Sequence, residues 1–232
     1  MGSQAAVPTV YGHRGKLRAV VLPGAFRPRS DTWLLADAAR RERMPAGGRV
    51  LELCAGPALA GVAAARALGA ALTTVDVSRR AGVNAILNGQ LNGVRVRARR
   101  GDLFAPVEGE RFDLILANPP YVPGPNLPRA GPARAWEGGF DGRAVLDRIC
   151  AQAPAHLAPD GAVLVVHSEV CDAAATLAGF AAAGLQAEIV TRRRCALGPL
   201  LQARRPLLEA RGLLPRGQTS EEVVVLRGRA PR

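Results

Sequence analysis

Apolar residues along most of this chain follow two alternating patterns. Short continuous apolar runs predict buried strands, and segments whose apolar residues recur every three or four positions predict helices. The runs predict strands at residues 49–53, 71–77, 94–99, 112–117, 162–167, 185–191 and 222–226, and the helical spacing predicts helices at 31–39, 58–68, 78–92, 143–157 and 172–183. Strands and helices that alternate at this rhythm predict an α/β fold, with a parallel sheet covered by helices on both faces.

The same pattern predicts how the chain is divided. Residues 1–46 begin with an irregular pattern and contain the helix predicted at 31–39, which Ser30 or Asp31 can cap. Gly47-Gly48 then interrupts the chain before the first strand. We therefore predict an N-terminal extension at 1–46, whose helix packs on a single domain at 47–232.

One strand ends in an unusual way. The apolar run 112–117 is followed directly by Asn118-Pro119-Pro120-Tyr121. Proline lacks the N–H that a sheet ladder requires, so the chain must turn out of the sheet here. Ligands of open α/β sheets bind at the carboxyl ends of the strands, which makes this turn a candidate site. The alternative is a plain strand-ending turn, with Asn118 as a cap.

The turn after the first strand indicates a ligand that approaches the backbone. Small residues between Cys54 and Gly61 lie where a helix is predicted to begin, and a helix N-terminus favours anions. The turn is not the dinucleotide fingerprint G-x-G-x-x-G, because Cys54 occupies the place of its first glycine.

Two further strand ends carry an acidic residue. Asp76, followed by Val77, can accept hydrogen bonds from the two hydroxyls of a ribose, or else cap the next helix. Asp102 follows Gly101 and can hold an adenine amino group while Leu103 packs on the ring, or else form an ordinary turn.

These segments, in this order, resemble a class I S-adenosylmethionine-dependent methyltransferase. The resemblance rests on Glu52-x-Cys54-x-Gly56, Asp76, Gly101-Asp102-Leu103 and Asn118-Pro119-Pro120-Tyr121. The last of these is typical of enzymes that methylate a planar amide or amine nitrogen. The resemblance implies a Rossmann-like doubly wound sheet of seven mostly parallel strands, the last antiparallel, and S-adenosyl-L-methionine as cofactor. The cofactor-binding residues that it implies are Thr32, Glu52, Cys54, Gly56, Asp76, Val77, Asp102, Leu103 and Asn118.

Two more segments are similar to the HemK/PrmC group, the glutamine N5-methyltransferases of peptide-chain release factors. Residues 26–32 resemble its P-R-x-[ED]-T segment, and residues 136–143 resemble its G-G-x-D-G loop, in which Asp141 would order a substrate loop. The chain is similar to the short branch of the group, without the N-terminal helical domain of the longer bacterial members. In that branch a small zinc-finger partner often stabilises the catalytic subunit. Cys54 and Ala58 depart from the pattern by replacing glycines, and we expect Ala58 to narrow the approach to the methionine end of the cofactor.

The Asn-Pro-Pro-Tyr turn suits the chemistry of methyl transfer to an amide. Asn118 Oδ1 and the Pro119 carbonyl are acceptors, which together can bind the two N–H groups of an NH₂. This cradle would orient the nitrogen toward the methyl group and offset the positive charge that develops on it. Tyr121 would cover the flat face of the amide. We therefore predict Asn118, Pro119 and Tyr121 as the catalytic residues.

Charge and cysteine content limit the remaining alternatives. The net charge is +12 with Lys16 as the single lysine, which reflects either GC-rich codon usage or an acidic partner such as RNA. Aromatic residues make up 4%, too few for a base-stacking platform. The most basic stretch, at 192–216, is either a solvated face or a substrate-gripping surface. The four cysteines are far apart, which predicts reduced thiols, no metal site and a cytoplasmic protein. We expect no membrane span, and Met1-Gly2-Ser3-Gln4 lacks the order of a signal peptide.

Four functions are therefore compatible with the sequence. The first is methylation of a protein glutamine, with a release factor as the substrate. The second is an adenine N6-methyltransferase on RNA or DNA, since an exocyclic amine fits the same cradle, and the third is a small-molecule N-methyltransferase of a biosynthetic pathway. The fourth is a non-catalytic cofactor-binding subunit, which Cys54 and Ala58 favour. His167 and Glu169, after the strand at 162–167, are further candidates for the ligand edge.

Overall fold

The computed structural model describes residues 17–23, 25–128 and 131–231. The start of the chain, with Met1 to Gln4 and Lys16, lies outside this part. None of the helices in the described ranges is long and apolar enough to cross a membrane.

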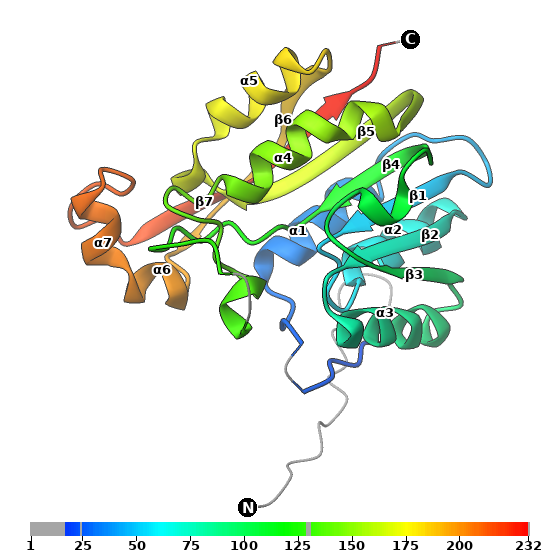
Figure 1. Cartoon of the computed structure of the whole chain (residues 1–232), viewed down its shortest axis with the longest axis horizontal. Helices are drawn as coiled ribbons and strands as arrows, with labels where there is room; N and C mark the ends of the chain where they lie inside the picture. Colours follow the sequence, from blue (N-terminus) through cyan, green and yellow to red (C-terminus); the bar gives the residue numbers. More distant parts are fainter. Residues whose placement is uncertain (1–16, 24, 129–130, 232) are drawn as a thin grey trace, which may run out of the picture.

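The described residues form one seven-stranded sheet, in the order β3-β2-β1-β4-β5-β7-β6 (Figure 1). The strands are β1 (Arg49–Leu53), β2 (Ala71–Asp76), β3 (Val96–Arg100), β4 (Phe112–Ala117), β5 (Leu157–Ser168), β6 (Gln186–Ala196) and β7 (Ser220–Arg229). The strands β1 to β5 pair in parallel, and β7 lies antiparallel between β5 and β6. The predicted mostly parallel sheet with an antiparallel last strand is therefore confirmed. The chain order reverses beside β1, and such a switch point is where open α/β sheets bind ligands.

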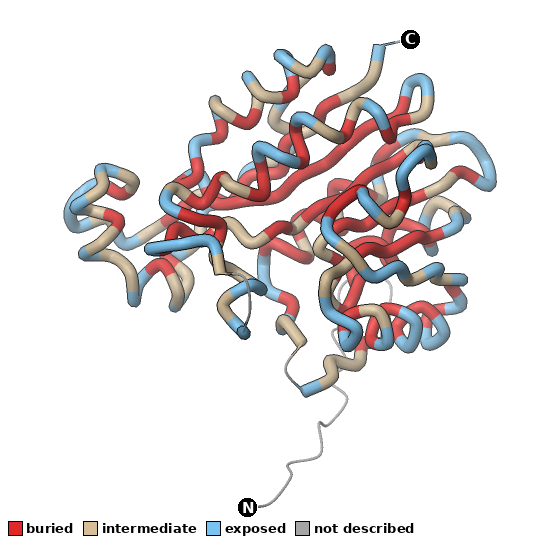
Figure 2. The backbone as a smooth tube through the Cα atoms, viewed as in Figure 1, coloured by how far each residue is buried: buried red, intermediate tan, exposed pale blue. Residues whose placement is uncertain are grey.

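Helices cover both faces of the sheet, because successive residues of a strand point to opposite sides. Leu51 packs in the core beneath α4 and α5, and Val50 in the core beneath α1 and α2. Figure 2 shows the inner strands, such as β1, β4 and the second half of β5, as continuously buried, whereas the outer strands β3 and β6 are largely exposed or half-buried. The helices are α1 (Ser30–Ala39), α2 (Leu59–Leu68), α3 (Arg79–Leu91), α4 (Ala144–Gln152), α5 (Ala173–Ala182), α6 (Pro199–Ala203) and α7 (Arg205–Ala210). Short 3₁₀ turns lie at Ala105–Val107, Pro132–Ala135, Ala153–His156 and Glu169–Cys171.

Several element boundaries differ from the sequence prediction, and three of the differences matter most. The helix expected at 143–157 ends at Gln152, since Pro154 cannot donate within an α-helix and residues 153–156 form a 3₁₀ turn. The strand β5 therefore begins at Leu157 rather than at 162. The strand β6 continues to Ala196, paired with β7 at Ser220, so Arg192, Arg193 and Arg194 belong to an outer strand and not to a connection.

The extended segment at 17–23 runs along α3. The backbone N–H groups of Arg18, Val20 and Leu22 donate to the side-chain oxygens of Asn92, Asn88 and Asn84, at 3.0, 2.8 and 3.0 Å. Four helical residues rise about 6 Å and two extended residues span about 6.6 Å, so the two repeats match. These three asparagines, here called the asparagine ladder, thus take the place of a neighbouring strand.

Candidate active site

A cavity of about 1160 Å³ opens at the carboxyl ends of β1, β2 and β4. At one end it is lined by the turns after β1 and β2, and at the other by Tyr121, Trp136 and the helix α6. The predicted catalytic and cofactor-binding residues all line it: Thr32, Glu52, Cys54, Gly56, Asp76, Val77, Asp102, Leu103, Asn118, Pro119 and Tyr121. The fold therefore brings together residues from five separate segments of the chain.

Glu52 holds the turn after β1 against the helix that follows. Its Oε2 accepts a hydrogen bond from the Gly61 N–H at 2.9 Å, one of the donors in the first turn of α2 that have no partner within the helix. A Cβ on Gly61 would lie 2.4 Å from this oxygen, so the position admits glycine alone without rearrangement. Burial raises the pKa of Glu52 to about 8. The side chain is therefore largely protonated at neutral pH.

Asp76 joins the end of β2 to the same turn. Its two carboxylate oxygens accept hydrogen bonds from the N–H groups of Gly56, at 2.9 Å, and Ser78, at 2.8 Å. Burial raises the pKa of Asp76 above its ordinary value. A carboxylate has about four acceptor positions, so two remain for ligand hydroxyls.

The two residues that replace glycines take up the conformation that glycine would have. The φ angle is 51° at Cys54 and 57° at Ala58, in the left-handed region that costs a side-chain-bearing residue about 1–2 kcal/mol. Cys54 lines the cavity, where burial raises the pKa of its thiol and keeps it protonated. Ala58 does not line the cavity, and its methyl group packs with Ala55 and Ala85. The expectation that Ala58 narrows the cofactor approach is therefore wrong.

Asp102 and Leu103 follow β3 at the edge of the cavity. Asp102 Oδ2 forms an ion pair with Arg148 of α4 at 2.6 Å, and both side chains are more than two-fifths exposed. Leu103 is buried, with a left-handed φ of 47°. This strained turn places Leu103 in the cavity wall below the exposed Asp102.

The Asn-Pro-Pro-Tyr turn is tied to the first turn of α1. Asn118 Nδ2 donates to Thr32 Oγ1 at 3.4 Å, and Tyr121 Oη donates to Asp31 Oδ2 at 3.0 Å. Burial and the nearby Asp31 raise the pKa of Tyr121 well above its ordinary value, so the phenol stays protonated. The sequence predicted Asp31 as a helix cap and not as a site residue. Its place beside Thr32 is a weak signal, because its partner Tyr121 lies 90 positions away in the sequence.

The glycine-rich loop at 136–143 packs against the backbone of the Asn-Pro-Pro-Tyr turn. A Cβ on Gly138 would lie 2.6 Å from the Pro120 carbonyl oxygen, and one on Gly142 would lie 2.1 Å from that of Tyr121. The Cys171 thiol also donates to the Tyr121 carbonyl, at 2.9 Å. The loop at 136–143 thus contacts the backbone of the turn so closely that side chains at these two glycines would displace it.

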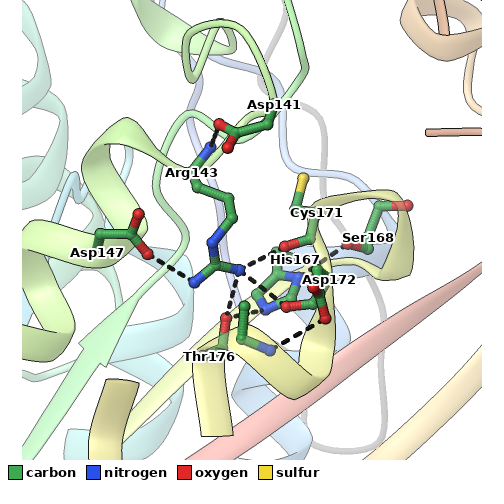
Figure 3. Close-up of polar contacts among 9 residues, drawn as sticks. Asp141, Arg143, Asp147, His167, Ser168, Cys171, Asp172 and Thr176 are labelled. Carbon is green, nitrogen blue, oxygen red and sulfur yellow. Dashed lines mark hydrogen bonds and ion pairs between the residues drawn. The ribbon is translucent and has the colours of Figure 1, made fainter. Parts of the chain in front are cut away.

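A buried arginine fixes this loop to α5 (Figure 3). The Arg143 backbone N–H donates to Asp141 at 3.0 Å, and its guanidinium donates to the Asp172 carbonyl, Thr176 Oγ1 and Asp147. The Asp141 carboxylate therefore stabilises the end of the loop, through its hydrogen bond with the Arg143 backbone N–H.

His167 belongs to this network and not to the cavity. Its ring lies 3.0 Å from Thr176 Oγ1 and 2.8 Å from the Ser168 carbonyl. Burial lowers the pKa of His167 to about 4, which keeps the ring neutral. Glu169 is exposed and pairs with Arg192 at 3.2 Å. Neither residue lines the cavity, so the expectation that they lie at the ligand edge is wrong.

The far end of the cavity is walled by α6, which the sequence did not predict. Leu200 and Leu201 line the cavity there, and with Trp136 and Val122 they belong to one apolar cluster. A spacing of apolar residues between 197 and 214 was the available signal, but the arginines between them suggested a surface.

Two of those arginines hydrogen-bond to backbone carbonyls within the protein. Arg204 donates to the Pro123 carbonyl at 2.6 Å and pairs with the largely buried Glu137. Arg211 donates to the Gly124 and Phe140 carbonyls, and its guanidinium lies 3.8 Å from the centre of the Phe140 ring. The basic stretch at 192–216 is therefore divided among an outer strand, loop anchors and exposed positions.

Comparison with curated proteins gives relatives of one kind. A uL3 ribosomal protein glutamine methyltransferase of Bradyrhizobium diazoefficiens is 43% identical over half of this chain and 39% of its own length. A release factor glutamine methyltransferase of Gloeobacter violaceus is 36% identical over 67% of this chain and 60% of its own. The chain thus spans less than two thirds of these bacterial relatives. The mouse methyltransferase HEMK2 is 33% identical over 69% of this chain and 78% of its own.

Solved structures and a family model agree with these relatives. A methyltransferase from Pyrococcus furiosus superposes with a TM-score of 0.63 at 16% identity, covering 93% of this chain and 90% of its own, which supports the fold. The model of the methyltransferase small domain matches residues 30–188. The similarity to the HemK/PrmC group is confirmed, and the chain belongs to the methyltransferase small domain family.

Proposed function

We propose that this chain is an S-adenosylmethionine-dependent N-methyltransferase whose acceptor is a glutamine side chain of a protein. The observation that carries the proposal is the orientation of Asn118. Its NH₂ group donates to Thr32, which leaves Oδ1 as an acceptor, and Asn118 and the adjacent Pro119 both line the cavity. Two acceptors on a proline-stiffened turn match the two N–H groups of a primary amide.

The residues around the cavity fit the proposed cofactor. Asp76 has acceptor positions left for ribose hydroxyls, and Gly56 brings the backbone close to the ligand without a side chain. Leu103 offers an apolar surface for a base, with Asp102 above it as an acceptor for an amino group. Glu52 and Cys54 line the side where the methionine portion would lie. Bound S-adenosylmethionine supplies a methyl group on a positively charged sulfur.

The chain's own contribution is to orient the acceptor and exclude water. Methyl transfer requires the amide nitrogen in line with the methyl group, about 3 Å away. Asn118 Oδ1 and the Pro119 carbonyl would hold the two N–H groups, and they would favour the positive charge that develops on nitrogen. Tyr121 would close over the amide plane, while Trp136 and Leu200 form an apolar wall toward the substrate.

The proposed substrate follows the relatives, whose names specify glutamines of release factors and of ribosomal protein uL3. An adenine in RNA or DNA or a small-molecule amine would fit the same cradle. No contact of the described residues favours them, and Arg204 and Arg211 hold the protein's own loops. We further propose that the chain acts in the cytoplasm, that 1–46 is an extension of the domain at 47–232, and that a small zinc-finger protein activates it.

The test compares acceptors side by side. The purified chain, with labelled cofactor, receives a release factor, ribosomal protein uL3, an oligonucleotide mixture or free glutamine, each with and without a zinc-finger activator. We expect label on a glutamine of one protein, mapped by mass spectrometry, and loss of that label with Asn118→Ala. Label on the oligonucleotides alone, or label that survives Asn118→Ala, would refute the proposal.

A further inference from the structure

The Asp31 carboxylate accepts three hydrogen bonds, and the proposed mechanism gives this side chain no function. It lies in the first turn of α1 and is 5% exposed. Its Oδ1 accepts from the Thr32 N–H at 2.6 Å and from the Thr32 hydroxyl at 3.3 Å, and its Oδ2 accepts from Tyr121 Oη at 3.0 Å. A single carboxylate therefore contacts both α1 and the turn that carries the proposed cradle.

The direction of these hydrogen bonds fixes the Thr32 hydroxyl. A hydroxyl has one proton to donate and two lone pairs that accept. Because the proton goes to Asp31, the Thr32 oxygen can only accept from its other neighbours. Those neighbours are the Arg29 N–H and Asn118 Nδ2, each at 3.4 Å.

The direction of the Thr32 hydrogen bonds also determines the orientation of the Asn118 amide. An acceptor at Thr32 requires the NH₂ end of Asn118 to face it, so Oδ1 faces away. If the Thr32 hydroxyl donated toward Asn118 instead, the amide would turn by half a rotation about its last bond. The NH₂ group would then take the place of the acceptor, and a substrate amide would meet a donor.

We propose that Asp31 is a positioning residue, which orients the Asn118 amide through the Thr32 hydroxyl and holds the Tyr121 ring directly. The proposal rests on the function proposed above, since it explains how the acceptor oxygen of the cradle is kept available. It adds a residue from outside the Asn-Pro-Pro-Tyr turn to the machinery of transfer. It also gives the aspartate-threonine pair of α1 a function that a helix cap does not require.

The test uses a graded set of variants. Thr32→Ser keeps the hydroxyl and Thr32→Val removes it at nearly equal volume, while Asp31→Ala removes the acceptor to which that hydroxyl donates. Nuclear magnetic resonance of the Asn118 side-chain NH₂, assigned by its loss in Asn118→Ala, reports its orientation without any substrate. We expect the wild-type signal in Thr32→Ser, and a shifted, faster-exchanging signal in Thr32→Val and Asp31→Ala.

Kinetics provide the second measurement. Thr32→Val and Asp31→Ala should lower kcat about 100-fold, the scale seen when one preorganised group is lost, with less than about threefold change in the acceptor KM. Thr32→Ser should restore most of kcat. Unchanged Asn118 signals in Thr32→Val, or kcat within threefold of wild type in Asp31→Ala, would overturn the proposal. Should Asp31→Ala fail to fold, Thr32→Val decides. If the wild type methylates no glutamine, the proposed function fails, whereas the resonance measurement still decides the role of Asp31.

Discussion

The Tyr121 hydroxyl donates to Asp31 Oδ2 across 90 positions of sequence, with an oxygen–oxygen distance of 3.0 Å. This bond joins the first helix of the chain to the turn after the central strand β4. It makes the N-terminal helix part of the site wall, since Thr32 and Ser30 of the same turn line the cavity. The Tyr121 ring is therefore held from two directions, by its own backbone and by α1.

Tyr121→Phe removes that bond while keeping the ring. Asp31 then loses one of its three donors in a buried place, which should lower the free energy of unfolding by about 1–3 kcal/mol. Methyl transfer should fall less than in Tyr121→Ala, because the apolar cover of the amide remains. Urea denaturation and the kcat of the two variants check this. Equal kcat for Phe and Ala would show that the ring itself has no part in transfer.

Gly142→Ala tests the support behind the turn. The new Cβ would lie 2.1 Å from the Tyr121 carbonyl oxygen, and φ at this position is +83°. Gly212 is the matched control, because its φ is +69° and a Cβ there meets nothing within 4 Å. We expect Gly142→Ala to abolish most transfer while Gly212→Ala keeps it, with the backbone strain of about 1 kcal/mol common to both. Similar activity in the two variants would contradict the close support.

The asparagine ladder predicts a link between the extended segment at 17–23 and the cofactor turn. Asn88 Nδ2 donates to the Val20 carbonyl at 3.1 Å and to the Pro57 carbonyl at 2.8 Å. Asn88→Ala leaves these buried groups without that donor, so it should cost about 2–4 kcal/mol of stability. It should also weaken cofactor binding, since Pro57 lines the cavity.

Calorimetry with the cofactor and limited proteolysis near residue 20 measure the two effects of the ladder. Gln90→Ala, at an exposed position of the same helix, is the control. The ladder has no role at the cofactor turn if Asn88→Ala loses stability but binds the cofactor as tightly as the control does.

Particular residues show how far the sequence could lead. The strand ends carrying Asp76 and Asn118 were predictable, because apolar runs ending in acidic or proline-containing turns place ligand groups at one edge of a parallel sheet. Asp31 was not, since its partner Tyr121 is distant in sequence and a capping role explained it locally. Arg204 and Arg211 resembled surface charges, because the carbonyls that they contact, of Pro123, Gly124 and Phe140, are distant in sequence. Arg192–Arg194 resemble a connection because an outer strand can carry polar residues on both faces.

Glu52 predicts a pH dependence of stability that a single substitution isolates. Its pKa is about 8 in the folded chain and 4.5 as the ordinary value, so between these values the folded state holds more of this proton than the unfolded state. Stability from this group is therefore complete below pH 4.5 and is lost as the pH rises toward 8, by at most about 1.4 kcal/mol per pH unit. His167, with its pKa lowered from 6.5 to about 4, acts in the opposite direction, but only below about pH 6.5. The clearest window is thus pH 6.5 to 8, where Glu52→Gln should flatten the decline in unfolding free energy measured by urea denaturation. Glu221, whose pKa is also raised by burial, remains in both proteins and cancels in the difference. The charge of Asp76 helps to raise the pKa of Glu52, so the substitution removes this interaction together with the Glu52 carboxyl. Parallel curves for the wild type and Glu52→Gln across this window would show that Glu52 is already ionised in the folded chain.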